Sequence, residues 1–364
     1  MRVPATLSCL ALASAAVLVA TPAAADPGTP ACGSTLTVDT VLRSDLVCAG
    51  DGLTLAADVD LDLHGHTLRG TAGGVGLSIA SVGSATVKNG TVTGWDTAVR
   101  TLVDWDVDEG SGPLTVDRVS FRGNGTGIDG TGDGGLRAKS MTVTRSTFTG
   151  NRRAGMTAEL TTVRIDCTTF ADNAVGYWGD TGSSATVTST RWLRNDRALI
   201  AVEANADIAR STFRDNPQAV YSTGAVAGIR LTDSRLSGSD VAFDGRGAEA
   251  RISSSTFVGN TTAVVVGPFG ATVSSSTFRD NGTTVTLDPD ALWSEPSVVV
   301  QGNVFRHNAD GLRLEGVGAF VSIGGNTARY NTGWGIYAPG ATDLGGDTAS
   351  HNGNEPQCVG VACS

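Results

Sequence analysis

Three carboxylates recur at nearly equal spacing in the middle of the chain. Glu159, Asp180 and Glu203 are 21 and 23 residues apart. If they lie on successive turns of a repeat, the carboxylates form a row with about 5 Å between neighbours and about 10 Å between the outer two. Retaining and inverting glycoside hydrolysis use carboxylate pairs at about these separations. The trio therefore predicts a catalytic site, aligned through three apolar residues that each lie three positions earlier: Met156, Tyr177 and Ile200.

An aromatic side chain accompanies the trio. Trp178 lies two residues before Asp180, so both side chains are expected on the same outward face of a strand. An exposed indole beside carboxylates is a platform on which a sugar ring can stack. The alternative is that the acids are only the solvated face of an acidic chain. The next copies of the repeat favour this alternative, because they carry Gly224 and Arg246 at the equivalent place.

Two acidic segments predict calcium loops. The first contains Asp104, Asp106 and Asp108, and the second contains Asp129 and Asp133. Carboxylates spaced by one residue or by glycine turns can supply the oxygen ligands that Ca²⁺ prefers. Neither segment matches the EF-hand pattern, and a solvated acidic loop is the alternative. Calcium is the one cofactor that the sequence suggests.

These residues are carried by an internal repeat, in which a large anchor residue is followed three positions later by asparagine. From Phe148 to Phe278 the anchors are 21 to 23 residues apart, and a period of this size indicates a solenoid. The anchors are Val92, Phe121, Phe148, Phe170, Trp192, Phe213, Leu236, Phe257, Phe278, Phe305, Ala328 and Ala349. The asparagines are Asn124, Asn151, Asn173, Asn195, Asn216, Asn260, Asn281, Asn308, Asn331 and Asn352.

The composition of the repeat is typical of β-strands. Thr, Ser, Val and Gly alternate with period two, as in residues 185–188. A coil of this length holds three short strands, and stacked coils pair each strand in parallel with its neighbours. The anchors would then form an aromatic column inside, and the asparagines, which tolerate left-handed backbone, would hydrogen-bond their equivalents in adjacent coils. The sequence thus predicts an all-β, single-stranded parallel β-helix of about 12 coils.

A family resemblance adds to this prediction. Residues 61–68, LDLHGHTL, together with the coil length and the asparagine column, resemble the right-handed parallel β-helices of the pectin-lyase-like superfamily. The resemblance implies a right-handed helix and chemistry on polysaccharides, although the same scaffold also carries adhesins. Signatures of polygalacturonases and alginate epimerases are missing. Residues 288–290, Asp-Pro-Asp, are nearest to the epimerase signature but lack its histidine.

The cysteines mark the two ends of the predicted helix. Cys32 and Cys48 precede the coils, and Cys358 and Cys363 lie at the end of the chain. We expect two local disulfides, because a β-helix exposes unpaired strand edges at its ends. Cys167 has no evident partner, and a lone cysteine of this kind is more often a packing residue than a reactive thiol.

The first residues indicate export. Arg2 precedes an apolar run that ends in alanines, which is typical of a secretory signal peptide, and no later stretch is apolar enough to span a membrane. We expect a secreted, extracellular protein. The predicted organisation is a signal peptide over 1–25, an N-terminal cap over 26–52, the right-handed parallel β-helix over 53–352 and a C-terminal cap over 353–364.

The charge restricts the partners. A formal net charge of −10 argues against binding nucleic acid. It also favours a neutral or weakly charged glycan over a polyanionic one, unless calcium reverses the local field. We expect a monomer with polysaccharide as its partner.

Two hypotheses about function remain open. In the first, the protein is a polysaccharide lyase or glycoside hydrolase that acts near the carboxylate trio. In the second, it is a non-catalytic structural or glycan-binding surface module. The missing family signatures favour the second hypothesis, and the family's fold favours the first.

Overall fold

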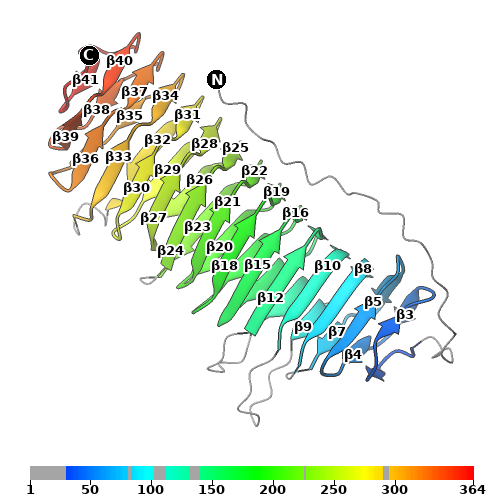
Figure 1. Cartoon of the computed structure of the whole chain (residues 1–364). Helices are drawn as coiled ribbons and strands as arrows, with labels where there is room; N and C mark the ends of the chain where they lie inside the picture. Colours follow the sequence, from blue (N-terminus) through cyan, green and yellow to red (C-terminus); the bar gives the residue numbers. More distant parts are fainter. Residues whose placement is uncertain (1–29, 81–82, 102–111, 132–138, 225–226, 290–294) are drawn as a thin grey trace, which may run out of the picture.

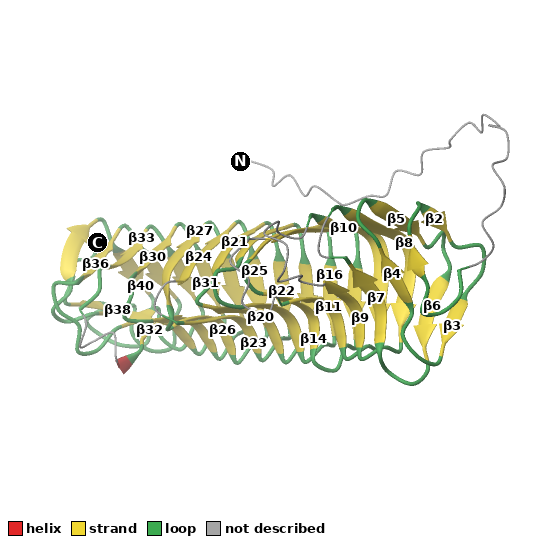
Figure 2. Cartoon of the chain, turned by 90° about the horizontal axis from the view of Figure 1, so that it is seen from below, coloured by secondary structure: helices red, strands yellow, loops and turns green. Residues whose placement is uncertain are grey.

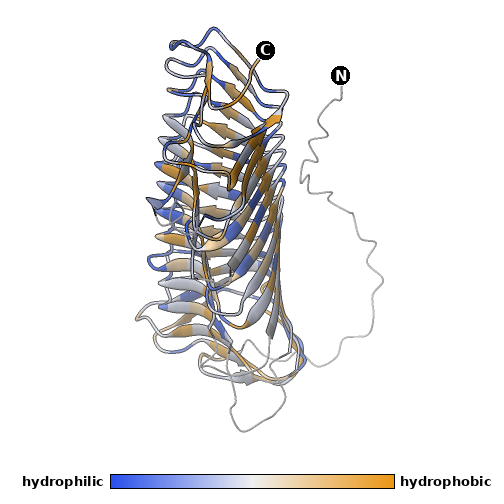
Figure 3. Ribbon diagram, turned by 90° about the vertical axis from the view of Figure 1, so that its left-hand side faces the viewer, coloured by the Kyte–Doolittle hydropathy of each residue, from blue (hydrophilic) through white to orange (hydrophobic). Residues whose placement is uncertain are grey.

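The computed structural model describes residues 30–80, 83–101, 112–131, 139–224, 227–289 and 295–364. Its strands wind into about 14 turns of one parallel β-solenoid, which stack into an elongated rod (Figure 1). A view turned by 90° shows the strands side by side along the whole rod (Figure 2). Hydrophobic and hydrophilic residues alternate along these strands (Figure 3), as expected when every second side chain points inward.

One side of the rod is a sheet of 12 parallel strands, which we call the first face. Neighbouring strands in this sheet come from consecutive coils. Its strands are β1 (Thr35–Leu36), β4 (Leu53–Leu55), β7 (Val75–Ile79), β9 (Thr97–Thr101), β11 (Thr126–Gly130), β14 (Ala154–Ala158), β17 (Val175–Gly179), β20 (Arg197–Val202), β23 (Gln218–Thr223), β26 (Val241–Gly245), β29 (Thr262–Val266) and β32 (Thr283–Leu287).

The second and third faces are joined because two long strands, β8 (Ala85–Thr93) and β10 (Leu114–Arg122), take part in both. The second face also contains β2 (Thr40–Val41), β5 (Val59–Asp62), β12 (Lys139–Thr144), β15 (Thr161–Asp166), β18 (Ser184–Thr188), β21 (Asn205–Ala209), β24 (Ala227–Thr232), β27 (Ala248–Ser253), β30 (Ala271–Ser274), β33 (Val298–Gln301), β36 (Val321–Gly324) and β39 (Thr342–Gly345). The third face also contains β3 (Leu46–Cys48), β6 (Thr67–Gly70), β13 (Thr147–Thr149), β16 (Thr169–Ala171), β19 (Arg191–Leu193), β22 (Thr212–Arg214), β25 (Arg235–Ser237), β28 (Thr256–Val258), β31 (Thr277–Arg279), β34 (Val304–Arg306), β37 (Thr327–Arg329) and β40 (Thr348–Ser350).

A separate sheet of three parallel strands follows the first face at its C-terminal end. Its strands are β35 (Leu312–Arg313), β38 (Ile336–Tyr337) and β41 (Cys358–Val359).

The number of coils exceeds the 12 that the repeat predicted, since the solenoid has about 14 turns. Strands that pair with the solenoid begin at Thr35, where β1 already pairs in parallel with β4. The same holds for β2 with β5 and for β3 with β6. The coil before Leu53 lacks the anchor and asparagine pattern, so its backbone pairing could not be read from the repeat.

The aromatic column inside the coils is confirmed. The rings are fully buried and stack in nearly parallel pairs with centroids 4.3 to 5.5 Å apart. Leu236 divides the column, because its side chain has no ring to offer. The first stack contains Phe121, Phe148, Phe170, Trp192 and Phe213, and the second contains Phe257, Phe278 and Phe305.

The asparagine ladder is confirmed as well. Asn195, for example, is fully buried, and its Nδ2 donates to the carbonyl of Phe170 and to Oδ1 of Asn216 at 3.0 Å each. The expected left-handed backbone lies one residue earlier, at Arg194 (φ 49°) before Asn195 and at Asp172 (φ 57°) before Asn173. The left-handed residue makes the corner, and the asparagine after it can therefore point inward to the next coil.

A second ladder runs between the second and third faces, and the sequence analysis missed it. Buried hydroxyl and amide oxygens accept the backbone N–H of the preceding coil, so each coil closes this corner with a side chain of the next. The ladder includes Ser211, Ser234, Ser255, Ser276, Asn303 and Asn326, and it ends at Asp347.

Disulfides Cys32–Cys48 and Cys358–Cys363 lie near the two ends, as predicted. Cys167 is disulfide-bonded, so the expectation of a lone packing thiol is wrong. The sequence argument had counted only the cysteines after the predicted cleavage site. Residues 1–25, the predicted signal peptide, lie outside the described residues. Within the described part of the chain, no helix has the length and apolar character needed to cross a bilayer.

Candidate functional site

The outward side of the first face carries one continuous row of side chains, which we call the outer row. Each member pairs in register with the next, so the side chains are about 4.8 Å apart along the rod. The outer row is Arg100, Asp129, Thr157, Trp178, Ile200, Tyr221, Asp244, Val265 and Thr286.

The middle of the outer row is apolar and aromatic. The Trp178 side chain is 40 % exposed, which makes it one of the few large apolar side chains that face solvent. Ile200 is only 2 % exposed, although it does not belong to the hydrophobic core formed by the described residues. Its two neighbours in the row, Trp178 and Tyr221, therefore cover it from both sides. The three side chains form a compact ridge on the outside of the coil.

Charged groups adjoin this ridge at Tyr221. The guanidinium of Arg197, from the start of β20, lies 5.7 Å from the centroid of the Tyr221 ring. Among the described residues no carboxylate forms an ion pair with Arg197. A guanidinium over an aromatic face is favoured electrostatically and keeps its remaining N–H groups available to a ligand.

Asp244 is the next member of the outer row, and it is fully buried on the outside of the sheet. Arg246 covers it, donating from Nε to Oδ1 at 2.9 Å and from Nη2 to Oδ2 at 2.6 Å. This is a bidentate, charge-assisted contact. Arg246 itself is half exposed, and its Nε lies 3.8 Å from Oδ2 of Asp288.

The contact with Asp244 also determines the chemistry of Arg246. Hydrogen bonding to Asp244 raises the pKa of the Arg246 guanidinium above its ordinary value, and the nearby charge of Asp288 raises it further. Arg246 therefore stays protonated and cannot act as a general base of the kind that a lyase needs. It can serve as a fixed hydrogen-bond donor at the surface.

The predicted carboxylate row is only partly in register. Tyr177 pairs with Met156 as expected, but its partner in the next coil is Leu199 and not Ile200. Glu159 and Asp180 each follow the paired residues Ala158 and Gly179 by one position, as the next list shows. In the third coil the pair is Ala201, so the equivalent position is Val202, and Glu203 lies one place further on.

Glu203 stands at a corner of the coil and not on the strand. It has left-handed backbone (φ 48°), as does Leu160 two coils earlier. The row failed at this point because the turn lengths differ. Three residues, 159–161, connect Ala158 to Thr162, and four residues, 180–183, connect Gly179 to Ser184.

The surroundings of the trio are polar and open. Glu159 and Asp180 are half-buried, whereas Glu203 is exposed. Oδ1 of Asp180 accepts hydrogen bonds from the backbone N–H and the hydroxyl of Thr181, at 2.8 and 3.2 Å. The catalytic role of the trio and the sugar-binding role of Trp178 stay predictions.

Most of the predicted calcium ligands, Asp104, Asp106, Asp108 and Asp133, lie outside the described residues. Asp129 is a half-buried member of the outer row. Its Oδ1 accepts the hydroxyls of Thr131 and Thr157 at 2.6 and 3.1 Å, and Oδ2 lies 3.8 Å from Arg100. The part of the chain that the structure describes holds no cluster of three or more His, Cys, Asp or Glu side chains suited to a metal ion.

Sequence reasoning missed Tyr221 and Asp244 and read Arg246 as an interruption of the acidic row. A signal for them was present. Trp178 and Tyr221 occupy the same strand position two coils apart, and Arg246 lies two residues after Asp244. What the sequence did not reveal is that this position faces outward next to a buried carboxylate.

Comparison with known proteins agrees with the fold. Residues 73–236 match the family described as the right-handed β-helix region. The solved periplasmic alginate epimerase AlgG is similar at 10 % identity and a TM-score of 0.37, over 86 % of this chain and 77 % of that chain. The A-module of Azotobacter vinelandii mannuronan C-5 epimerase AlgE6 gives 13 % identity and a TM-score of 0.30, over 92 % and 91 %.

A third similar structure is the catalytic domain of a GH87 α-1,3-glucanase, at 10 % identity and a TM-score of 0.21, over 95 % of this chain and 70 % of that chain. At these identities the likeness concerns the fold alone. No curated protein matches the chain in sequence. The family match and the parallel coils described above identify a right-handed parallel β-helix that fits the pectin-lyase-like superfamily.

Proposed function

We propose that the protein is secreted and binds extracellular or cell-wall polysaccharide along the outer row. The observation that carries this proposal is the ridge of Trp178, Ile200 and Tyr221, which is apolar, aromatic and outside the core. Aromatic faces stack on the apolar faces of sugar rings while their polar edges remain wet. The rod offers such contacts in line, since each coil repeats about 4.8 Å after the previous one.

The charged neighbours of the ridge suit hydroxyl groups. Arg197 is held over Tyr221, and Arg246 is held by Asp244, so both guanidinium groups are oriented before a ligand arrives. Oriented donors lose little conformational entropy on binding, which favours specific hydrogen bonds to sugar hydroxyls. A binding surface is therefore the function that the geometry supports best.

Catalysis is the finer hypothesis. The protein would then be a polysaccharide lyase or glycoside hydrolase with Glu159, Asp180 and Glu203 as its acid and base groups. The protonated state of Arg246 speaks against a lyase that uses this arginine as base. The alternative is a non-catalytic structural or glycan-binding surface module.

The location rests on the disulfides and on the predicted signal peptide. Disulfides near both ends of the rod persist in oxidising compartments. Polysaccharide is the partner expected in that space, and a monomer remains our expectation.

The test is a glycan screen on the purified mature chain, with and without calcium, scoring bound polysaccharide and released products. Trp178→Ala is expected to weaken binding about tenfold or more, because it removes the exposed stacking surface. Phe269→Ala is the matched control, since Phe269 is 41 % exposed but lies off the outer row. Equal binding by the Trp178 and Phe269 variants would overturn the proposal.

Products separate the two hypotheses about catalysis. If wild type releases products and the triple variant Glu159→Gln, Asp180→Asn, Glu203→Gln does not, the protein is an enzyme with its site at the trio. Binding without products, unchanged in the triple variant, means a binding module.

A further inference from the structure

The first face is interrupted near its C-terminal end. The 12-stranded sheet ends at β32, and the three-stranded sheet begins with β35 of the next coil. The two strands lie side by side, yet no ladder joins them in the described sheet order. The hydroxyl of Thr284 donates to the carbonyl of Gly311 at 2.6 Å and closes one end of the gap.

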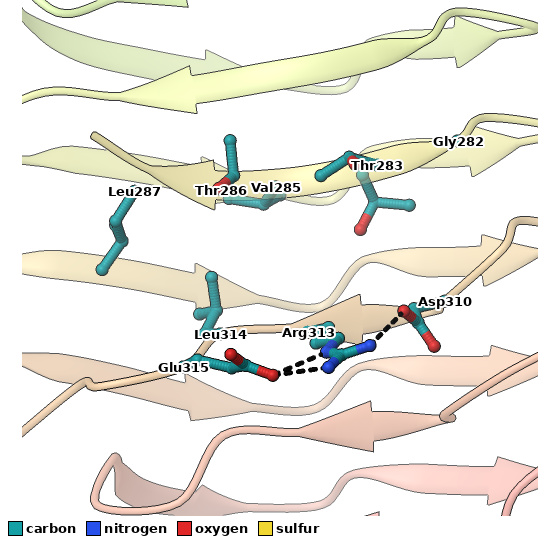
Figure 4. Close-up of a pocket in the computed structure, with 10 residues that line it drawn as sticks. Gly282, Thr283, Val285, Thr286, Leu287, Asp310, Arg313, Leu314 and Glu315 are labelled. Carbon is teal, nitrogen blue, oxygen red and sulfur yellow. Dashed lines mark hydrogen bonds and ion pairs between the residues drawn. The ribbon is translucent and has the colours of Figure 1, made fainter. Parts of the chain in front are cut away.

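A pocket of about 350 Å³ occupies this interruption, between β32 and residues 310–315 (Figure 4). Its size is at the small end of the range for ligand pockets. Leu287 and Leu314 lie at one end of the pocket, and Thr283 lies toward the other end (Figure 4). Thr286, the last member of the outer row, also lines the pocket.

Charged groups in the pocket are fixed before any ligand binds. Nε of Arg313 donates to Oε1 of Glu315 at 3.0 Å, and Nη1 of Arg313 lies 3.6 Å from Oδ2 of Asp310 (Figure 4). Asp310 is held in turn, because its Oδ1 accepts the backbone N–H of Trp334 at 2.6 Å. The pocket thus presents two carboxylates and one guanidinium in a set arrangement.

An inserted peptide strand does not fit the gap. Strands on either side of an inserted strand would be about 9.6 Å apart, twice the normal spacing. Cα atoms of β32 and β35 instead approach within 8 Å. The backbone groups of β32 at the interruption therefore need a compact partner rich in hydroxyl groups.

We propose that this pocket is a terminal subsite for a neutral sugar residue. Carboxylate oxygens accept hydrogen bonds from sugar hydroxyls, the spare N–H groups of Arg313 donate to them, and the two leucines contact the apolar face of the ring. Two carboxylates against one guanidinium leave the pocket net negative, so it rejects a uronate by like-charge repulsion.

This inference rests on the proposed function, because Thr286 connects the outer row to the pocket. A glycan chain that lies along the outer row toward the C-terminal end reaches the pocket with its last residue. The inference adds a substrate class, neutral glycan, and a direction along the rod.

The test is isothermal titration calorimetry of the mature chain with xylotetraose, cellotetraose and mannotetraose, and with tetragalacturonate as the charged probe. Wild type is expected to bind a neutral tetraose at least about tenfold more tightly than the uronate. Glu315→Gln removes one negative charge and should reduce this preference about fivefold or more. Glu249→Gln is the matched control, since Glu249 pairs with Arg251 two residues away on another face, at 2.9 Å.

Each outcome decides. Tighter binding of the uronate, or equal effects of the Glu315 and Glu249 variants, overturns the pocket. If Trp178→Ala weakens polysaccharide binding while Glu315→Gln changes nothing, the outer row stands as the binding surface and the pocket does not. If no probe and no polysaccharide binds, both proposals fail.

Discussion

Asp347 ends the second ladder with a carboxylate where the two coils before it have asparagine. The residue is 1 % exposed, and its Oδ1 accepts the N–H and Nδ2 of Asn326 at 2.7 and 3.0 Å. Oδ2 is buried and has no hydrogen-bond partner among the described residues. Burial raises the pKa of Asp347 above its ordinary value, even though Asn326 donates two hydrogen bonds to it.

This residue predicts a pH dependence. Between the unfolded pKa of about 3.9 and the raised folded pKa, the folded state binds more protons, so the free energy of unfolding falls as pH rises. Asp347→Asn removes this loss and should stabilise the protein at pH 7 by about 1 kcal/mol or more. The difference between variant and wild type should vanish at about pH 3, where both states of Asp347 are protonated. Urea unfolding across pH measures it.

Asp343 is the control for this experiment, because its shift has the opposite sign. Backbone N–H groups of Ala362 and Gly345 lower the pKa of the exposed Asp343 carboxyl. Its stabilising contribution is present above its unfolded pKa and is lost as pH falls. Asp343→Asn should therefore destabilise the protein at neutral pH. A stabilisation by both variants would contradict the assignment.

At the scale of the elements, the internal column distributes stability along the rod. Phe213 is fully buried and stacks on Trp192, with centroids 5.5 Å apart, and it ends the first stack before Leu236. Phe213→Ala leaves a cavity that neighbouring coils cannot close, because each coil is fixed by its ladders. The free energy of unfolding should fall by about 3 to 5 kcal/mol.

Denaturant melts of the Phe213 variant test this prediction. The control is again Phe269→Ala, whose ring is 41 % exposed, and a change within about 0.5 kcal/mol is expected for it. A loss below about 1 kcal/mol for Phe213→Ala would show that the column does not carry the expected packing energy.

At the scale of the whole molecule, the rod is held by contacts between neighbouring coils. Stability in such a stack is nearly a sum of terms from each coil and its neighbours, so the ends open first. The disulfides lie near those ends, where Cys32–Cys48 spans the first coil and Cys358–Cys363 the last.

This arrangement predicts a local effect of disulfide removal. Cys358→Ser with Cys363→Ser should speed amide hydrogen exchange in β38 and β41, while β17 to β26 keep their protection. The pair Cys32→Ser with Cys48→Ser should do the same at the opposite end and serves as the mirror control. Faster exchange throughout the rod in either variant would mean that the coils unfold as one unit.

The sequence alone determined the repeat, the anchor column, the asparagine ladder and both end disulfides. These features recur at a period of about 22 residues, and a column inside a coil needs only the same residue type at the same place in each repeat. Backbone pairing without that pattern was invisible, which is why the coil around β1 to β3 was missed.

The tertiary structure decided which outward side chains are neighbours. One extra residue between Gly179 and Ser184 shifts the register, so Glu203 left the predicted row and Ile200 joined Trp178 and Tyr221. Outward positions carry no hydrophobic pattern that would reveal such a shift, because solvent accepts almost any side chain there. The interruption between β32 and β35 likewise depends on how two coils pack, and no local pattern in the sequence encodes it.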